Sequence, residues 1–288
     1  MKTKIFILGI IVLLFTVSCS KKDSSDTSSM SKEEAQSSSK IDLASDDVST
    51  IVEDQYNNID SSSFSNKNGE MAFSTCATIT RNPDFGTAPT VNQTVTKTID
   101  FGTGCTLSNN NVVSGIITIS FVYNPSATPQ VVTYSFTNFY HNNIKIEGNK
   151  TFTRTMTVAT ATSPSHPIVV MQMDLTATIN GQSHHRVGTR TREIIAGYDT
   201  PNVFSDNVYS ITGNWTTTHP TGTVTSTITS PLLAKMSCMN VNKPLLVQGV
   251  ITFNKNNHSA TLDYGSGDCD NLAVFTVNGI SYNIVIGN

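Results

Sequence analysis

The residues in this chain best suited to binding chemistry form a row of cations. They are His184, Arg186, Arg190 and Arg192. Their even numbers place them on one face if residues 183–195 form a strand. The row holds three of the five arginines in the chain, and a guanidinium can bind both oxygens of a carboxylate, sulfate or phosphate. The row is therefore a candidate ligand-binding site for a polyanion. The alternative is a solvated strand face whose charges discourage edge-to-edge pairing.

A hairpin turn at Asn180-Gly181 sets the orientation of this row. Before the turn, the odd positions of residues 169–179 are apolar and are expected to face a core. A two-residue turn would place Arg186 opposite Leu175 on that apolar face, whereas a three-residue or bulged turn would place it opposite Thr176. Because a slip by one residue moves every side chain to the other face, burial favours the longer turn. We therefore predict a solvent-facing arginine row.

One sequence motif occurs twice, each time before a cysteine. TIDFGTG ends at Cys105, and TLDYGSGD ends at Cys269. An earlier cysteine, Cys76 or Cys238, lies about 30 residues upstream of each copy. Four cysteines in an oxidising compartment allow three pairings, and the repeat favours the disulfides Cys76–Cys105 and Cys238–Cys269. A zinc site is the rival interpretation, but no CxxC pair or nearby histidine has ligand spacing.

Acidic residues in the second copy could instead ligate calcium. Asp263, Asp268 and Asp270 place oxygen ligands at a turn, as a calcium loop would. The first copy keeps only Asp100, and the spacing does not match an EF-hand. Asx-turn hydrogen bonds, with glycines at positive φ, explain both copies without an ion. We therefore expect no metal and no other cofactor.

Two further interpretations rest on side-chain types. No GxSxG or HExxH motif is present, and few glutamates follow the first 40 residues to supply the carboxylate pair of a glycosidase. We expect a protein that is not an enzyme, with a hydrolase of envelope or external polysaccharide as the alternative. Aromatic residues could stack on sugar rings or form core and cross-strand pairs. They are Tyr123, Tyr134, Phe136, Phe139, Tyr140, Tyr209 and Trp215.

The first residues indicate export and lipid attachment. Two lysines precede an apolar run at residues 5–17, which is typical of a signal peptide and too short to span a membrane. The small residue before Cys19 resembles a bacterial lipobox. Residues 1–18 are therefore the predicted signal peptide, Cys19 the predicted lipidation site, and the membrane its partner through that anchor. Residues 19–40 are rich in serine and are expected to form a disordered tether.

The remaining chain divides into two parts by pattern. Residues 41–60 have apolar positions near a period of 3.6, which predicts a short helix that docks on the β-rich part or forms a loose stalk, with a partner-binding helix as the alternative. Residues 71–288 consist of β-rich runs separated by turn residues such as Asn-Gly. We predict a single all-β antiparallel domain there, either a β-sandwich or a curled meander.

The composition agrees with an extracellular β protein that does not bind nucleic acid. Only 14% of residues are charged. Removing residues 1–18 removes two lysines, so 16 basic residues remain against 21 acidic ones, a net charge of −5. A weakly acidic chain gives no reason to expect a nucleic-acid partner.

The lipobox, the serine-rich tether and the repeated motif Thr-Ile/Leu-Asp-Phe/Tyr-Gly-x-Gly before cysteine resemble those of uncharacterised lipoproteins of Bacteroidota, especially flavobacteria. The resemblance covers most of the β-rich part, and the function of that family is unknown. It implies an outer-membrane lipoprotein on the periplasmic or cell-surface face. We predict a non-enzymatic binding or structural module that engages a glycan or another envelope protein.

Overall fold

The computed structural model describes residues 29–62, 66–67, 70–71, 76–161, 163–200 and 203–286. The predicted signal peptide and the predicted lipidation site at Cys19 lie outside these residues. Within them, no helix is both long and apolar enough to cross a membrane.

One open antiparallel sheet of fourteen strands makes up most of the described chain. Its strands are β3 (Thr78–Asn82), β4 (Thr94–Asp100), β5 (Cys105–Thr106), β6 (Val112–Val122), β7 (Gln130–His141), β8 (Ile144–Met156), β9 (Pro167–Ile179), β10 (Gln182–Ala196), β11 (Val208–His219), β12 (Gly222–Lys235), β13 (Leu246–Lys255), β14 (His258–Ser266), β15 (Leu272–Val277) and β16 (Ile280–Val285). Neighbours along the chain are neighbours in the sheet, apart from the short β5, which pairs with β6. This order confirms the all-β antiparallel prediction in its curled-meander form. A separate two-stranded sheet joins β1 (Asn66–Lys67) and β2 (Glu70–Met71).

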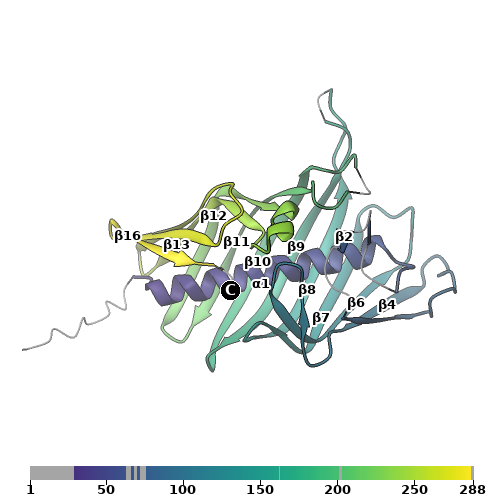
Figure 1. The fold of residues 1–288 in the computed structure, drawn as a ribbon, viewed down its shortest axis with the longest axis horizontal. Coiled ribbons are helices and arrows are strands. Elements are labelled where there is room, and N and C mark those ends of the chain that lie inside the picture. The colour runs from purple at the N-terminus through teal and green to yellow at the C-terminus, as the bar shows by residue number, and fades with distance from the viewer. Residues whose placement is uncertain are drawn as a thin grey trace, which may run out of the picture.

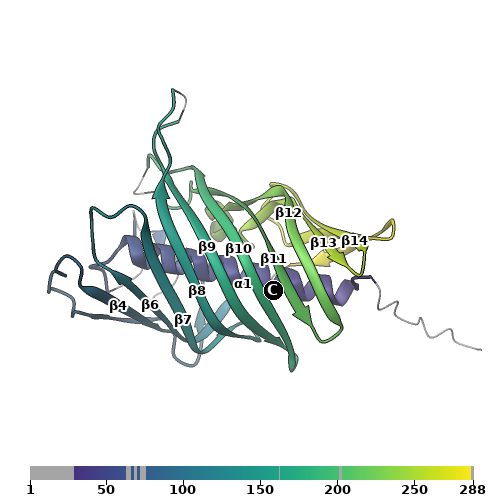
Figure 2. The ribbon, with the colours of Figure 1, turned by 180° about the vertical axis from the view of Figure 1, so that it is seen from behind.

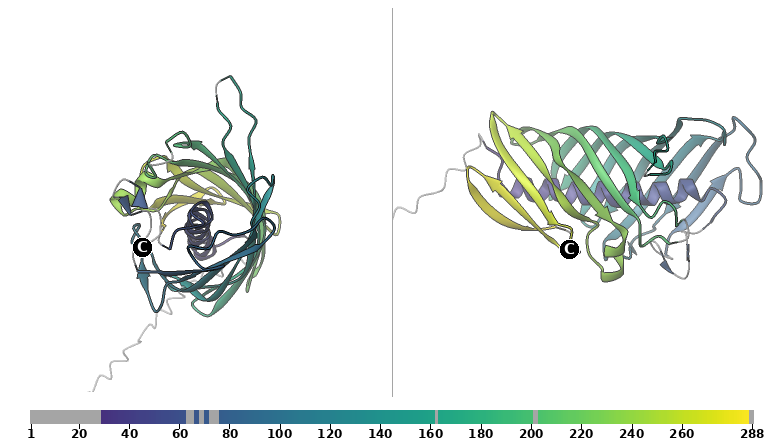
Figure 3. Two further views of the ribbon diagram at one scale, coloured as in Figure 1. Left: turned by 90° about the vertical axis from the view of Figure 1, so that its right-hand side faces the viewer. Right: turned by 90° about the horizontal axis from the view of Figure 1, so that it is seen from above.

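The sheet curls around a single long helix, α1 (Lys32–Asn57). Figure 1 and Figure 2 show α1 running along the length of the sheet, and the end-on view in Figure 3 shows it within the concave side. The apolar residues of α1, such as Ile41, Val48 and Ile51, are buried in the same core as the inward-facing residues of the strands. The core therefore lies between a helix and the sheet that wraps it.

Helix α1 begins nine residues earlier than the predicted helix at residues 41–60. Ser31 caps it through a capping box, in which Ser31 Oγ accepts the N–H of Glu34 at 3.2 Å and Glu34 Oε2 accepts the N–H of Ser31 at 2.9 Å. The predicted disorder of residues 19–40 is therefore wrong from residue 32 onward. The serines of this segment give no apolar face, but the sheet surrounds them and supplies polar partners, and tertiary contacts provide most of the stability of a helix.

The β9–β10 hairpin has the shorter of the two registers considered above. The strands pair so that Arg186 lies opposite Leu175. Asn180 and Gly181 have φ of 49° and 76°, as a two-residue type I′ turn requires. The predicted longer turn, with its solvent-facing arginine row, is therefore wrong. The concave face accommodates arginine because α1 places carboxylates against it, and the apolar pattern of β9 does not reveal them.

Both predicted disulfides are present. Cys76 precedes β3 and bonds to Cys105 in β5, while Cys238 lies in the short 3-10 helix η1 (Met236–Val241) before β13 and bonds to Cys269 after β14. Each bond therefore spans an equivalent two-strand unit, β3–β4 or β13–β14. The repeat in the sequence corresponds to a repeat in the structure.

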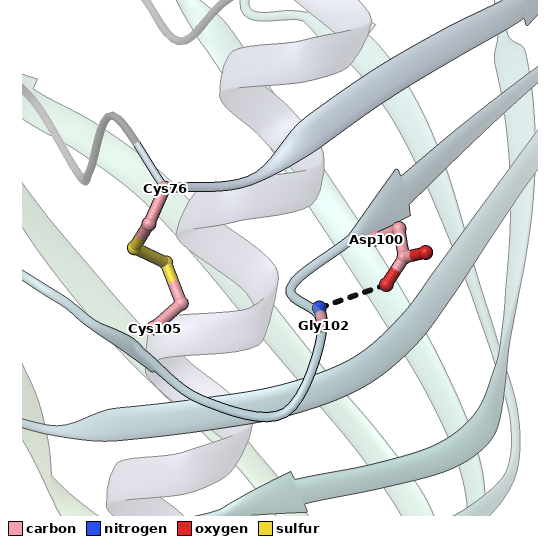
Figure 4. The surroundings of a disulfide bond; sticks show 4 residues. All are labelled: Cys76, Asp100, Gly102 and Cys105. Atoms are coloured by element: carbon pink, nitrogen blue, oxygen red, sulfur yellow. Dashed lines mark hydrogen bonds between the residues drawn. A yellow bond between two sulfur atoms is a disulfide. The ribbon is translucent and has the colours of Figure 1, made fainter.

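The repeated motif forms the same turn in both copies. Asp100 Oδ1 accepts the N–H of Gly102 at 2.8 Å (Figure 4), and Asp263 Oδ1 accepts the N–H of Gly265 at 2.9 Å. Both glycines have positive φ. The Asx-turn interpretation is therefore confirmed, and these aspartates serve to fix turns at the ends of β4 and β14.

Candidate functional site

The concave side of the sheet holds an unusual amount of buried charge. Helix α1 carries seven acidic residues and two lysines. Seven lysine and arginine side chains of the described strands are buried, and they are Arg81, Lys97, Lys150, Arg186, Arg190, Arg192 and Lys255. Most of these cations contact α1 or the residues just after it. Because ionised side chains are rarely buried without partners, the pairing of an acidic helix with a basic concave face accounts for both.

Asp42 lies at the centre of this pairing. Its Oδ1 accepts hydrogen bonds from Arg186 Nη1 at 2.5 Å and from Arg190 Nη2. Its Oδ2 accepts one from the hydroxyl of Tyr264 at 3.3 Å. Arg186 Nη2 also donates to Ser38 Oγ at 3.1 Å. Two arginines of β10 thus share one carboxylate of α1 in a fully buried cluster.

The indole ring of Trp215 on β11 provides a second partner for these two arginines. The guanidinium carbons of Arg190 and Arg186 lie 4.1 and 5.1 Å from its ring centroid. Gly188 is paired with Trp215 in the sheet, and a Cβ at Gly188 would lie 2.4 Å from the Trp215 Cβ. Because Gly188 has no side chain, β10 and β11 can approach closely at Trp215. The cation–π contacts of Arg186 and Arg190 form on the indole ring of this tryptophan.

His184, the first member of the row, has a different partner. Its Nδ1 lies 2.8 Å from Nδ1 of His219. Burial lowers the pKa of both imidazoles, and with the neighbouring His184 it brings the pKa of His219 to about 4. Both rings are therefore neutral at neutral pH, so one can donate to the other. Glu34 of α1 lies nearby and accepts hydrogen bonds from Lys255 at 2.8 and 3.1 Å.

Lys97 binds the C-terminal end of α1. Its Nζ donates to the carbonyl oxygens of Gln55, Asn58 and Ser61 at 3.1, 2.9 and 3.1 Å. A cation at this end also complements the helix dipole. Burial lowers the pKa of Lys97 to about 8.

Two further clusters fix the position of α1 along the sheet. Lys150 Nζ donates to Ser45 Oγ at 2.9 Å, and burial lowers the pKa of Lys150 to about 7. Asp47 accepts hydrogen bonds from the amide of Asn111 at 2.8 Å and lies 2.7 Å from Nε2 of His141. These residues are buried and serve to hold the helix.

A cavity of about 290 Å³ lies near the C-terminal end of α1, between that helix, strands β8 to β11 and the loop after β10. This volume is near the lower end of the range of small-molecule sites, about 300–1,000 Å³. Its charged lining residues are Glu53, Arg154 and Arg192. Its aromatic lining residues are Tyr56, Phe152, Tyr198, Phe204 and Tyr209.

Arg192 is the buried cation of this cavity. Its side chain is 1% exposed, its Nη1 donates to Glu53 Oε1 at 3.2 Å, and its guanidinium carbon lies 3.7 Å from the ring centroid of Tyr209. Within the described part of the chain, its Nε and Nη2 have no hydrogen-bond partner. Burial raises the pKa of Glu53, and Arg192 opposes that shift. Arg192 is therefore covered by protein atoms and held between Glu53 and Tyr209 at the edge of the cavity.

A second arginine lies on the same face of the sheet. Val169 of β9 is paired with Arg154 of β8 on one side and with Arg192 of β10 on the other. Residues directly opposite each other in an antiparallel sheet share a face. The two arginines therefore flank Val169 across three adjacent strands, about 10 Å apart at the backbone.

The predicted cation row thus divides between two roles. Arg186 and Arg190 bind Asp42 and hold α1, whereas His184 binds His219 of the neighbouring strand β11. Arg192 is the one member of the row that lines the cavity. Arg192 and Glu53 are far apart in the sequence. Had the arginine row been predicted as buried, the acidic residues of 41–60 would have been candidate partners, and Glu53 is one of them. No sequence signal pointed to Arg154 or Tyr56.

The aromatic residues considered for sugar stacking also divide. Tyr134, Phe139 and Trp215 are buried, which agrees with the core interpretation. Tyr209 lines the cavity, and the exposed ring of Tyr140 does not. The aromatic wall of the cavity comes mostly from residues that the sequence did not single out.

Comparisons with known proteins give no assignment. No family model, no curated protein and no solved structure matches this chain. Among the described residues, no group of three or more histidine, cysteine, aspartate or glutamate side chains could hold a metal ion.

Proposed function

We propose that this protein is a lipid-anchored envelope protein whose β domain binds a small molecule and does not transform it. The observation that carries the binding function is the cavity beside Arg192. It is concave, its walls are aromatic and aliphatic, and it has few charged groups, which is the usual composition of small-molecule sites.

The alternative function, hydrolysis of a polysaccharide, has less support. A glycosidase needs two carboxyl groups about 5–10 Å apart. The lining of the cavity includes a single carboxylate, Glu53. That carboxylate binds Arg192, so it is engaged in a structural ion pair.

A fragment screen tests the binding function. The chain from residue 20 onward, which lacks the predicted signal peptide and Cys19, should give hits in a thermal-shift screen, because a ligand that binds only the folded state stabilises it. Val203 lines the cavity from the loop between β10 and β11. Val203→Trp should fill part of the space and abolish these hits. Hits that survive this substitution bind elsewhere, and a complete absence of hits would contradict the proposed site.

The anchor and the outer-membrane location rest on the sequence. An apolar run at residues 5–17 before Cys19, together with the resemblance to lipoproteins of Bacteroidota, supports lipidation of Cys19. Cys19→Ala should block labelling with radioactive palmitate and release the protein from the membrane fraction. Labelling that persists in Cys19→Ala would show that the anchor is elsewhere.

A further inference from the structure

We propose that the free edge of β16 (Ile280–Val285) binds a second copy of this chain, with the two β16 strands paired antiparallel about Asn283. This surface shares no residue with the cavity, so the inference does not depend on the proposed binding function.

The first observation is that β16 is an edge strand. Among the described residues, it pairs with β15 on one side and with no strand on the other. Figure 1 shows it at the left end of the molecule, beside the start of α1. The unpaired side of an edge strand presents N–H and C=O groups that another strand can bind. The sheet can therefore be extended at β16.

The second observation is the direction of the backbone groups in β16. Its hairpin with β15 turns at Asn278-Gly279, and both residues have positive φ, as a two-residue type I′ turn requires. In such a hairpin the residues that flank the turn, here Val277 and Ile280, form a hydrogen-bonded pair. At the other end, the N–H of Ile286 donates to the carbonyl oxygen of Asn271 at 2.8 Å. The even-numbered residues of β16 therefore bond to β15.

The odd-numbered residues of β16 point their backbone groups to the free edge, because these directions alternate along a strand. They are Ser281, Asn283 and Val285. If two copies pair about Asn283, this residue lies opposite Asn283 of the second copy, and Ser281 lies opposite Val285. All three residues then exchange hydrogen bonds with residues whose groups are also free. A shift by two residues leaves one of the three unpaired, and a shift by one places them against groups already bonded to β15.

The third observation is the composition of this edge. Strand β16 has the sequence Ile-Ser-Tyr-Asn-Ile-Val, without a charge or a proline, so two copies would not bring like charges together. Three of its apolar side chains are exposed, Ile280 by 56%, Tyr282 by 36% and Val285 by 53%. Leu272 of β15, which lies opposite Val285, is 51% exposed. Pairing with a second copy would cover part of this apolar surface.

The other edge of the sheet is protected. Strand β3 contains Arg81, whose charged side chain points inward and is buried, and Pro83, which has no N–H, follows the strand directly. Inward-pointing charges and prolines are features that prevent pairing at sheet edges. Because β3 is protected and β16 is not, the edge of β16 fits another β16 and not β3. A contact between identical edges closes as a dimer with two-fold symmetry.

Sedimentation velocity tests the association. The chain from residue 20 onward, which lacks the predicted signal peptide and Cys19, should sediment as a dimer that dissociates on dilution. Asn283→Lys places two lysines directly opposite each other at the two-fold axis, so this variant should be a monomer. Thr80→Lys adds the same charge at an exposed position of β3 and should leave the dimer intact. Near-ultraviolet circular dichroism of Trp215 checks that both variants are folded.

Cysteine cross-linking tests the register without an added charge. Residues of a hydrogen-bonded antiparallel pair have Cα atoms about 5.5 Å apart, which lies within the range that a disulfide spans, about 4.4–6.8 Å. Asn283→Cys should therefore give a disulfide-linked dimer on a non-reducing gel after mild oxidation. Ser281→Cys should not, because its two cysteines would lie about 13 Å apart along the strands. A mixture of Ser281→Cys with Val285→Cys should again give the linked dimer.

The outcomes identify the occupant of the edge. A parent chain that stays monomeric contradicts pairing with a second copy. If that monomer binds a synthetic peptide of residues 280–286, the edge accepts a strand of another protein and the second copy is the wrong occupant. A dimer that persists in Asn283→Lys places the contact elsewhere on the molecule and overturns the proposal. Equal cross-linking of Asn283→Cys and Ser281→Cys contradicts the two-fold register.

Discussion

Asp42 shows how a residue that the sequence places on a polar helix can determine the interior of the fold. Its carboxylate accepts hydrogen bonds from Arg186, Arg190 and Tyr264, and all four side chains are buried. Removing one partner from a buried ion pair leaves an uncompensated charge, which costs much more than the pair contributes.

Asp42→Asn should therefore lower the free energy of unfolding by about 3 kcal/mol or more. The matched control is Asp174→Asn. Asp174 also accepts a hydrogen bond from a basic side chain, His185, but it is 72% exposed. Exposed pairs contribute about 0–1 kcal/mol, so the control should change little. Denaturant titration of both variants measures the difference. Equal losses would show that burial does not set the value of the Asp42 cluster.

The His184–His219 pair predicts a dependence of stability on pH. The pKa of His219 is about 4 in the folded chain because burial, and then His184, disfavour its protonation. In the unfolded chain its pKa is about 6.5. Above that value both states are neutral. As the pH falls from about 6.5 to about 4, the unfolded state binds a proton that the folded state does not, so stability falls by at most about 1.4 kcal/mol per pH unit.

His219→Gln should remove this part of the pH dependence. The measurement is the free energy of unfolding of the variant and the parent at several pH values between about 4 and 7, and the quantity of interest is the difference between the two curves. His258→Gln, at an exposed histidine on β14, is the control and should follow the parent. A variant with the same slope as the parent would contradict the assignment.

Helix α1 fills the interior of the curled sheet, which apolar side chains fill in most β folds. It brings acidic residues to a concave face that carries seven buried cations. Without α1, these cations would face one another across the interior. The sheet and the helix therefore depend on each other for stability.

A chain that begins at residue 58 should fail to fold, and adding a peptide of residues 29–62 should restore the fold. The measurement is near-ultraviolet circular dichroism of Trp215, which lies beneath two of the cations. A control peptide with Asp42→Asn, Asp46→Asn and Asp47→Asn has the same length but lacks these carboxylates, so it should restore less. A stable sheet in the absence of any peptide would contradict this dependence.

The sequence predicted those features that depend on neighbouring residues. Asn180-Gly181 indicated a hairpin, and the repeated cysteine motif indicated both disulfides. The predicted register of that hairpin was wrong because the residues that stabilise the observed register lie elsewhere in the chain. Arg190 and Asp42 are 148 positions apart, and no local pattern reveals that an acidic helix covers the apolar face. The cavity was missed for the same reason, since its lining comes from α1 and four strands.

In the whole molecule, the proposed anchor would be attached at one end of the described fold. Lys32 begins α1 next to β16, where its Nζ lies 5.8 Å from the ring centroid of Tyr282. The chain from Cys19 to Ser31 can span at most about 40 Å. With Cys19 lipidated, this end of the sheet would lie within about 40 Å of the membrane. Glu53 lies about 30 Å further along the helix axis, so the cavity would lie toward the end of α1 that is farther from the anchored residue.

The central position of α1 also has a consequence for the order of folding. The helix is synthesised first, but Lys255 follows its partner Glu34 by 221 residues, and Tyr264 follows Asp42 by 222. Each hairpin of the meander can form from local contacts, whereas contacts of such long separation form slowly. The residues of α1 that pair with the last strands, such as Glu34, must therefore remain unpaired until those strands are added, whereas Lys97 and Asn111 can bind the helix early. Its seven acidic residues would keep it in solution during this time, and the last strands would complete the fold by closing over it.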